Sequence, residues 1–210
     1  MDSTLYGGKV INMPSTTAGR KFPVEILTKD EARALLLAPS TRAPTGIRNR
    51  ALIAVLYGAG LRIAEALALK PSDVDVDAAS IRVLHGKGDQ ARTVGIDGGA
   101  LVHVVRWIEL RRGLGIRGRH LFSTLNGGVL SPSYARDMIK RMATRAKIDK
   151  RVHPHGMRHT HASELDREGM PVIVIQQQLG HTSLQTTATY LDHISPSDRI
   201  ELIKNRREVI

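Results

Sequence analysis

The sequence contains no cysteine, and this absence excludes several kinds of chemistry at once. Disulfide bonds, thiolate nucleophiles and cysteine-ligated zinc all require the missing side chain. A chain without cysteine fits a reducing compartment, and we expect this protein in the cytoplasm. Aromatic residues make up only 3% of the chain, so its core must be built from Leu, Ile, Val, Ala and Met.

Long hydrophobic runs are also missing, whereas positive charge is abundant. No apolar stretch approaches the roughly 20 residues that a membrane-spanning helix needs, and the N-terminus lacks the apolar segment of a secretory signal. The 31 Lys and Arg residues exceed the 20 Asp and Glu residues, which gives a net charge of +11. This charge favours polyanions, either nucleic acid or an anionic membrane. Because the apolar segments of a membrane protein are missing, nucleic acid is the leading partner and we expect no membrane. Composition alone also fits a soluble basic protein without such a partner.

The first part of the chain shows helical periodicity. Residues 1–24 mix Gly, Ser, Thr, Pro and Lys without a sustained period, which predicts an arm or linker. Thr28 and Glu31 have the spacing of a capping box, so a helix begins there and should end before Pro39. Further predicted segments are a loop over 40–47, a helix from Ile47 to the break at 58–60, a helix from Arg62 to Leu69, and a turn at 72–73.

The periodicity changes over residues 80–96, where Ile81, Val83, Val94 and Ile96 alternate with polar neighbours, as in strands. Residues 85–92 between them form a Gly-rich basic turn, so this segment predicts a β-hairpin. The later predicted segments are a helix over 99–112, a short strand or turn at 121–123, a helix over 131–147, helices starting at Pro154 and Pro171, a helix from Ser183 to Tyr190, and an amphipathic helix over about 197–207. This order predicts a mainly α fold with a small antiparallel β-sheet, of the α+β class.

One stretch near the C-terminus holds a candidate nucleophile, because His181 precedes Tyr190 by nine positions. Cleavage of a phosphodiester without a metal needs cations on the non-bridging oxygens and a proton for the leaving 5′ oxygen. It also needs a nucleophile in line opposite that oxygen. Tyr190 is the candidate nucleophile, and arginine is the best cation because a guanidinium group can hold two oxygens at once.

The remaining parts of such a site occur along the chain. Arg62 follows a Gly-Ala-Gly-Leu turn at a helix start. His155 and Arg158 lie three residues apart, on one face of a helix. Lys87, at the tip of the hairpin, could protonate the leaving oxygen if desolvation lowers its pKa, and His181 could donate a hydrogen bond to the phosphate.

Each of these residues also has a simpler interpretation. Arg62 could pair with Glu65 at the surface, and Lys87 could be a solvated turn residue. A histidine such as His181 often closes a turn, and a tyrosine on a helix is usually half-buried in the core. His155 and His159 have the spacing of a zinc-binding helix, but no glutamate lies between them to act as a base, so we expect no metal.

Basic residues outside the candidate site are expected to bind DNA. They are Arg92 in the hairpin turn and Arg136, Lys140 and Arg141 on the helix over 131–147.

The order of these motifs resembles that of the tyrosine recombinases, the phage-type integrases. The matching pieces are Gly60-Leu-Arg62-Ile-Ala-Glu65, the Lys87 hairpin, His155-Gly-Met-Arg158-His-Thr160, Leu179-Gly-His181 and Thr189-Tyr190. Each piece is a loose match alone, but their order and spacing together are highly specific. The resemblance covers about residues 25–195, and it implies the catalytic-domain fold of the DNA breaking-rejoining enzymes.

The resemblance also implies a role for each residue. Arg62 and Arg158 bind the scissile phosphate, while Glu65 orients the site. Lys87 protonates the leaving 5′ hydroxyl, His155 assists proton transfer, and His181 donates to the phosphate. Tyr190 attacks to give a 3′-phosphotyrosyl link without a cofactor, metal or ATP, so that a 5′ hydroxyl from another strand can reverse the step.

The same resemblance implies partners and a domain organisation. The expected partner is double-stranded DNA with a specific recombination site, bound by a homotetramer that forms from free monomers. We expect an arm at 1–24, a catalytic domain at 25–195 and a docking helix at 196–210, in a nucleoid-associated protein. Relatives carry an N-terminal helical domain, so we expect this chain to be either a fragment or a naturally short member that binds DNA weakly or uses an accessory DNA-binding protein. The alternatives are a DNA-binding regulator without strand exchange and a type IB topoisomerase-like enzyme.

Overall fold

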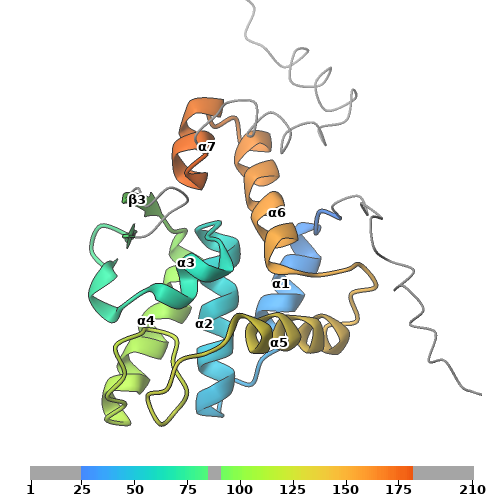
Figure 1. Cartoon of the computed structure of the whole chain (residues 1–210). Helices are drawn as coiled ribbons and strands as arrows, with labels where there is room; N and C mark the ends of the chain where they lie inside the picture. Colours follow the sequence, from blue (N-terminus) through green and yellow to red (C-terminus); the bar gives the residue numbers. More distant parts are fainter. Residues whose placement is uncertain (1–24, 85–90, 182–210) are drawn as a thin grey trace, which may run out of the picture.

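The structure is a computed structural model that describes residues 25–84 and 91–181 (Figure 1). Its first helix, α1 (Lys29–Leu37), begins with the predicted capping box. The backbone N–H of Glu31 donates to Thr28 Oγ1 at 3.2 Å, and the backbone N–H of Thr28 donates to Glu31 Oε2 at 2.7 Å. These two bonds satisfy N–H groups that have no partner within the helix, so the local sequence determines where α1 begins.

The second helix, α2 (Pro44–Gly58), is the centre of the fold, and the side chains along most of its length are buried. The predicted loop over 40–47 was wrong at its end, because the helix begins at Pro44 rather than at Ile47. Proline suits the first helical position, since its missing N–H would have no partner there. Buried Arg48 donates to the carbonyl of Ser123 at 3.0 Å, which ties α2 to the connection before the fifth helix.

A short helix and a small sheet follow. The helix α3 (Ile63–Ala68) is followed by the 3₁₀ turn η1 (Pro71–Asp73) and by the strands β1 (Val74–Asp75), β2 (Ser80–Val83) and β3 (Arg92–Gly95). The sheet is antiparallel in the order β1-β2-β3, with Ile81 opposite Val94. The hairpin prediction is confirmed for the described residues, but β1 was missed, because two residues are too few to show an alternating pattern.

Two further helices follow the sheet and contribute buried side chains to the core. The helix α4 (Gly98–Gly113) is capped by Asp97, and its fully buried Trp107 donates to the carbonyl of Leu121 at 2.8 Å. Beyond the isolated bridge between Ser123 and Val129, helix α5 (Pro132–Arg145) is capped by Ser131.

The last described helices form a hairpin of their own. The helix α6 (Pro154–Arg167) is followed by α7 (Val172–Leu179), and both start beside the predicted prolines. Between these two helices, Ala162, Ile175 and Leu179 form a small separate core.

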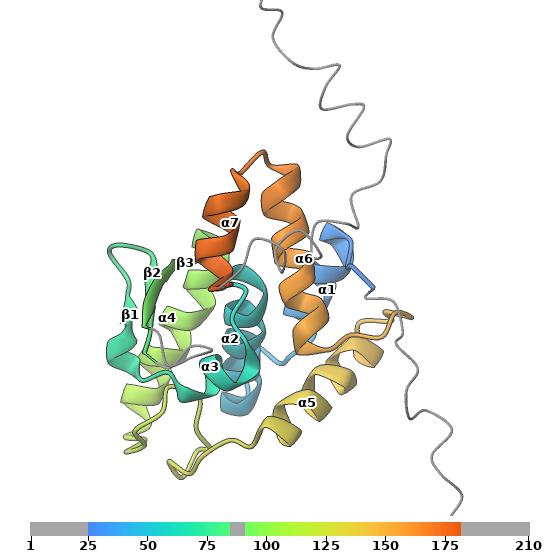
Figure 2. The same ribbon diagram turned by 45° about the horizontal axis from the view of Figure 1, so that its top comes forward.

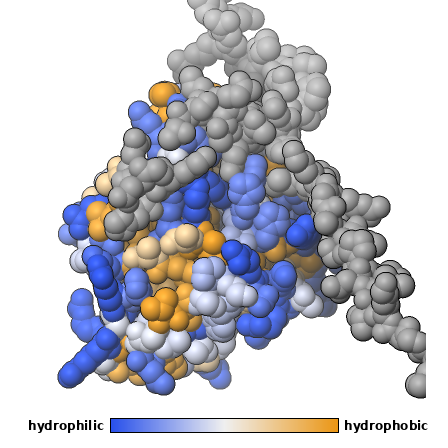
Figure 3. Space-filling view, viewed as in Figure 1, coloured by the Kyte–Doolittle hydropathy of each residue, from blue (hydrophilic) through white to orange (hydrophobic). Residues whose placement is uncertain are grey.

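The helices α1, α4 and α6 pack against α2. Figures 1 and 2 show α4 on one side of α2, α1 and α6 on the other, and α7 beside β3. The prediction of a mainly α fold with a small antiparallel sheet is therefore confirmed. Polar side chains cover most of the face seen in Figure 3, with apolar patches between them. None of the described helices is long and apolar enough to cross a membrane.

Candidate active site

The turn between α2 and α3 presents Arg62. Gly60 has a φ of +63°, and a Cβ at this position would lie 2.5 Å from Cδ2 of His161, so the turn requires glycine. Arg62 is the N-cap of α3, and its side chain is 31% exposed. Its guanidinium donates to Glu65 Oε1 at 2.8 Å and to the carbonyl of Gly180 at 3.5 Å. Arg62 therefore stays partly open to solvent while it contacts the end of α7.

Glu65 lies at the centre of the arginines, and its side chain is only 3% exposed. Both of its oxygens accept from Arg92 at 3.0 Å, and Oε2 also lies 4.0 Å from Nη1 of Arg158. Burial raises the pKa of Glu65, but hydrogen bonds from Arg92 and Arg62 outweigh burial, so the pKa lies below its ordinary value. The anionic carboxylate can thus hold three guanidinium groups in one place.

Arg158, on α6, is almost completely buried, with a side chain that is 1% exposed. Its Nη1 donates to the carbonyl of Gly60 at 2.7 Å, and its Nη2 donates to the carbonyl of Leu179. Carbonyls at the end of a helix carry partial negative charge, which stabilises a cation there. Arg158 therefore connects α6 to the turn before α3 and to the end of α7.

Arg92 does not lie in the hairpin turn, where the sequence analysis placed it. It is the first residue of β3, paired with Val83 of β2, and its side chain is 14% exposed. Alternation along a strand points this side chain toward Glu65 rather than outward. Its Nε also donates to the carbonyl of Gln178 at 3.4 Å. Its expected contact with DNA stays a prediction.

Three histidines gather at the start of α6. The ring of His155, an exposed residue, stacks on that of His153 with centroids 6.3 Å apart. Its Nε2 lies 3.1 Å from Nε2 of buried His159. Although His155 is exposed as a whole, partial desolvation of its ring lowers its pKa. His153, Arg158 and Arg62 lower this pKa further. His155 is therefore mainly neutral at pH 7.

His181 follows the C-cap of α7. Gly180 has a φ of +62°, and a Cβ there would lie 2.7 Å from Nε of Arg92, so glycine lets the chain pass close to the arginines. Only 7% of His181 is exposed. Burial lowers its pKa to about 4, with further contributions from Arg158, Arg62 and other cations. His181 is therefore neutral near pH 7 and has one N–H to donate.

Comparisons with known proteins identify the family of this chain. The sequence profile of the Phage integrase family matches residues 25–195. The chain belongs to this family.

Several related proteins are recombinases. The chain is 38% identical to tyrosine recombinase XerC of Xanthomonas axonopodis pv. citri, over 82% of this chain and 55% of that protein. The fold matches the crystal structure of XerA recombinase with a TM-score of 0.78 and 33% identity, over 92% of this chain and 68% of that one. It also matches XerH site-specific recombinase bound to a palindromic difH substrate, with a TM-score of 0.74 and 27% identity, over 90% of this chain and 55% of that one. The chain thus has the catalytic-domain fold of this family and spans about half the length of XerC.

The structure brings together most of the site residues that the sequence of this integrase-family chain predicted. Arg62, Glu65, Arg158, His155 and His181 form one cluster, joined by the contacts and electrostatic interactions above. Lys87, Tyr190, the arm at 1–24 and the helix over 196–210 lie outside the described residues. The residues expected on a DNA-binding face, Arg136, Lys140 and Arg141, are exposed on α5.

Two contributors to this cluster were missed in the sequence analysis. His159 had been considered only as a zinc ligand, although its position four residues after His155 also signals a pair on one helix face. Gln178 gave no local signal, because its partners lie far away in sequence. Its side-chain amide bonds to the N–H and the carbonyl of Gly95 and to the carbonyl of Ala59.

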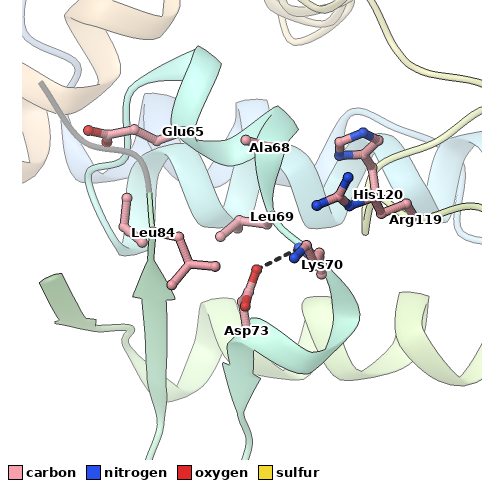
Figure 4. Close-up of a pocket in the computed structure, with 9 residues that line it drawn as sticks. Glu65, Ala68, Leu69, Lys70, Asp73, Leu84, Arg119 and His120 are labelled. Atoms are coloured by element: carbon pink, nitrogen blue, oxygen red, sulfur yellow. Dashed lines mark hydrogen bonds between the residues drawn. The ribbon is translucent and has the colours of Figure 1, made fainter. Parts of the chain in front are cut away.

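A cavity of about 200 Å³ lies on the other side of Glu65 (Figure 4). Its walls come from α3 with the following turn, from the end of β2, and from Arg119 and His120 across the opening. Among its described lining residues, only Glu65 belongs to the arginine cluster. Arg62, whose side chain is 31% exposed, opens the arginine cluster to solvent outside this cavity.

Metal binding has no evident site among the described residues, where no three histidine, aspartate or glutamate side chains are arranged to hold an ion. The polar groups that converge in the candidate site are chiefly arginines and histidines, which are suited to hold an oxyanion.

Proposed function

We propose that this chain is the catalytic part of a site-specific DNA recombinase that cleaves and rejoins DNA through a 3′-phosphotyrosyl intermediate. One observation carries the proposal: Arg62 and Arg158 converge on Glu65, next to His155 and His181. Fixed cations of this kind stabilise the charge that develops on a phosphodiester during displacement. Because arginine guanidinium groups stay charged at any physiological pH, they do so without a metal.

Each residue of the site has its own role in the proposed reaction. Arg62, which is partly exposed, and buried Arg158 hold the non-bridging oxygens, and His181 donates its single N–H to one of them. Tyr190 attacks the phosphorus and displaces the 5′ oxygen, which takes a proton from Lys87. His155 assists proton transfer. The products are a 3′-phosphotyrosyl link and a free 5′ hydroxyl, and attack by another 5′ hydroxyl reverses the step without ATP.

The proposed partner is double-stranded DNA with a specific recombination site. The related XerH recombinase has been solved on a DNA substrate, and the excess of basic residues in this chain favours such a partner. We propose that free monomers assemble as a homotetramer on two such sites, with help from an accessory DNA-binding protein.

A nicked suicide substrate tests the proposed chemistry. End-labelled duplexes that carry a site selected by binding from a random pool are incubated with the full chain and run on a denaturing gel. The wild type should give a covalent adduct without added metal or ATP, and Tyr190→Phe should give none. Tyr134→Phe is the matched control, because Tyr134 accepts a hydrogen bond from Arg48, outside the site.

Further outcomes separate the alternatives. Arg62→Ala should slow adduct formation by about 100-fold or more while DNA binding changes little, because the guanidinium acts mainly on transition-state charge. An adduct that persists in Tyr190→Phe would assign the nucleophile to another residue. Relaxation of any supercoiled plasmid, with no preference for a site, would indicate a topoisomerase, and DNA binding without an adduct would indicate a regulator.

A further inference from the structure

The buried histidine one turn after His155 has no role in the reaction described above. His159 is 4% exposed. Its Nε2 lies 3.1 Å from Nε2 of His155, and the two rings meet edge to face, with centroids 4.5 Å apart and planes at 89°. This distance and orientation are those of a hydrogen bond between the two rings.

A second histidine also contacts the ring of His155. The ring of His153 stacks on it at an interplanar angle of 17°. His153 is itself positioned, because its Nδ1 accepts the backbone N–H of Gly156 at 3.0 Å. His155 thus has a positioned ring stacked on it and a buried ring within hydrogen-bond distance of its Nε2.

The protonation state of His155 decides which of the two Nε2 atoms donates the hydrogen bond. When His155 takes up a proton, both of its ring nitrogens carry hydrogen, so its Nε2 must donate. His159 can then only accept, and acceptance requires its neutral form. Because His159 is almost fully buried, burial disfavours a positive charge on its ring.

We propose that His159 is a positioning residue that accepts the Nε2–H of His155 and leaves Nδ1 of His155 as the nitrogen that exchanges a proton during DNA cleavage. This inference rests on the proposed function, because it assumes that His155 transfers a proton. It follows the pattern in which a catalytic base is itself oriented by a neighbouring side chain.

The proposal has a consequence for pH dependence. The groups that surround His155 are His153 before α6, Arg158 and His159 on α6, Arg62 before α3, and His181 after α7. Burial, His153 and the two arginines lower the pKa of His155, whereas an acceptor for its proton opposes this shift. Loss of His159 as the acceptor should lower the pKa of His155. One limb of the pH–rate profile should then move to lower pH.

Two substitutions in the full chain test the proposal. His159→Leu fills the space without an acceptor, and His159→Gln supplies a side-chain oxygen. In single-turnover adduct formation, His159→Leu should be slower by about tenfold or more, with its pH limb moved to lower pH. His159→Gln should stay within about threefold of the wild type, and DNA affinity should be unchanged in both. His103→Leu on α4 is the matched histidine control and should behave as the wild type.

A measurement without DNA tests the pairing by itself. Two-bond ¹⁵N–¹H correlation spectra of the histidine-labelled wild type should show neutral His155 protonated on Nε2, with Nε2 of His159 unprotonated. The reverse assignment would overturn the proposal, and it can be made even if His159→Leu does not fold.

The outcomes distinguish this inference from the proposed function. If the wild type gives no adduct that depends on Tyr190, the proposed function fails, and the spectra still decide the pairing. If the wild type cleaves and His159→Leu matches it in rate and pH profile, the positioning role is wrong. If His159→Gln is as slow as His159→Leu, His159 is only structural.

Discussion

Among the single residues of the site, Glu65 is the anion that three arginines approach. Its carboxylate bonds to the guanidinium groups of Arg62 and Arg92 and lies 4.0 Å from that of Arg158. A buried anion among cations keeps the arginines together despite their mutual repulsion. Its loss would leave buried positive charge without compensation, which is costly.

We therefore expect Glu65→Gln to destabilise the fold by about 3–5 kcal/mol at pH 7 and to slow DNA cleavage. Urea denaturation and the adduct assay measure these effects. Glu109→Gln is the control, because Glu109 is exposed on α4. Equal stability of Glu65→Gln and wild type at pH 7 would show that the arginines do not need the charge.

The same comparison has a pH dependence of known sign. The pKa of Glu65 in the folded chain lies below the ordinary value of 4.5. The stabilising effect of the carboxylate is therefore complete above that value and is lost as the pH falls through the folded pKa. The stability difference between wild type and Glu65→Gln should shrink below about pH 4.5, as urea denaturation at several pH values would show.

Among the elements, α7 is joined to the sheet by several hydrogen bonds of the Gln178 side chain. Gln178 accepts from the N–H of Gly95 at 3.0 Å and donates to the carbonyls of Gly95 and Ala59 at 2.8 and 3.2 Å. These bonds join α7 to β3 and to the end of α2. They hold in place the helix end whose carbonyls accept from Arg62 and Arg158.

Gln178→Ala should therefore destabilise the fold by about 1–3 kcal/mol, because three hydrogen bonds are lost. Amide exchange on α7 should accelerate more than exchange on α4. Gln177→Ala is the matched control, since Gln177 is exposed on the same helix. If exchange rises equally on both helices, Gln178 stabilises the whole fold and not α7 in particular.

For the molecule as a whole, the distribution of charge links the fold to its proposed partner. The chain carries a net charge of +11. Exposed Arg136, Lys140 and Arg141 lie on α5, whose apolar face is buried. A basic face on a helix that is anchored by its core side can contact DNA phosphates without disturbing the fold.

Alanine at Arg136, Lys140 and Arg141 together should weaken DNA binding at all sequences. It should also reduce the slope of log K against log salt by up to about 3, since each phosphate contact contributes about 0.9. The control replaces exposed Arg33, Arg112 and Arg117, which lie outside α5, and changes the net charge equally. Equal salt slopes for the two triple variants would show that only net charge matters.

The sequence by itself determined most of the elements and the kinds of residue in the site. The capping box at Thr28, the prolines at the starts of α5 and α6, and the alternation of Ile81 and Val94 are local signals, because the groups involved lie a few residues apart or follow one period. The start of α2 escaped prediction because no side chain caps it, although Pro44 stands where prolines also begin α5 and α6. The strand β1 escaped because it has only two residues.

Only the tertiary structure decided which side chains meet. Arg92 of β3 contacts Glu65 of α3, and Gln178 reaches Gly95 because α7 packs against β3. Such contacts depend on how elements far apart in the sequence pack together, and no local pattern encodes that packing. The roles of Lys87 and Tyr190 stay predictions, which the adduct assay addresses.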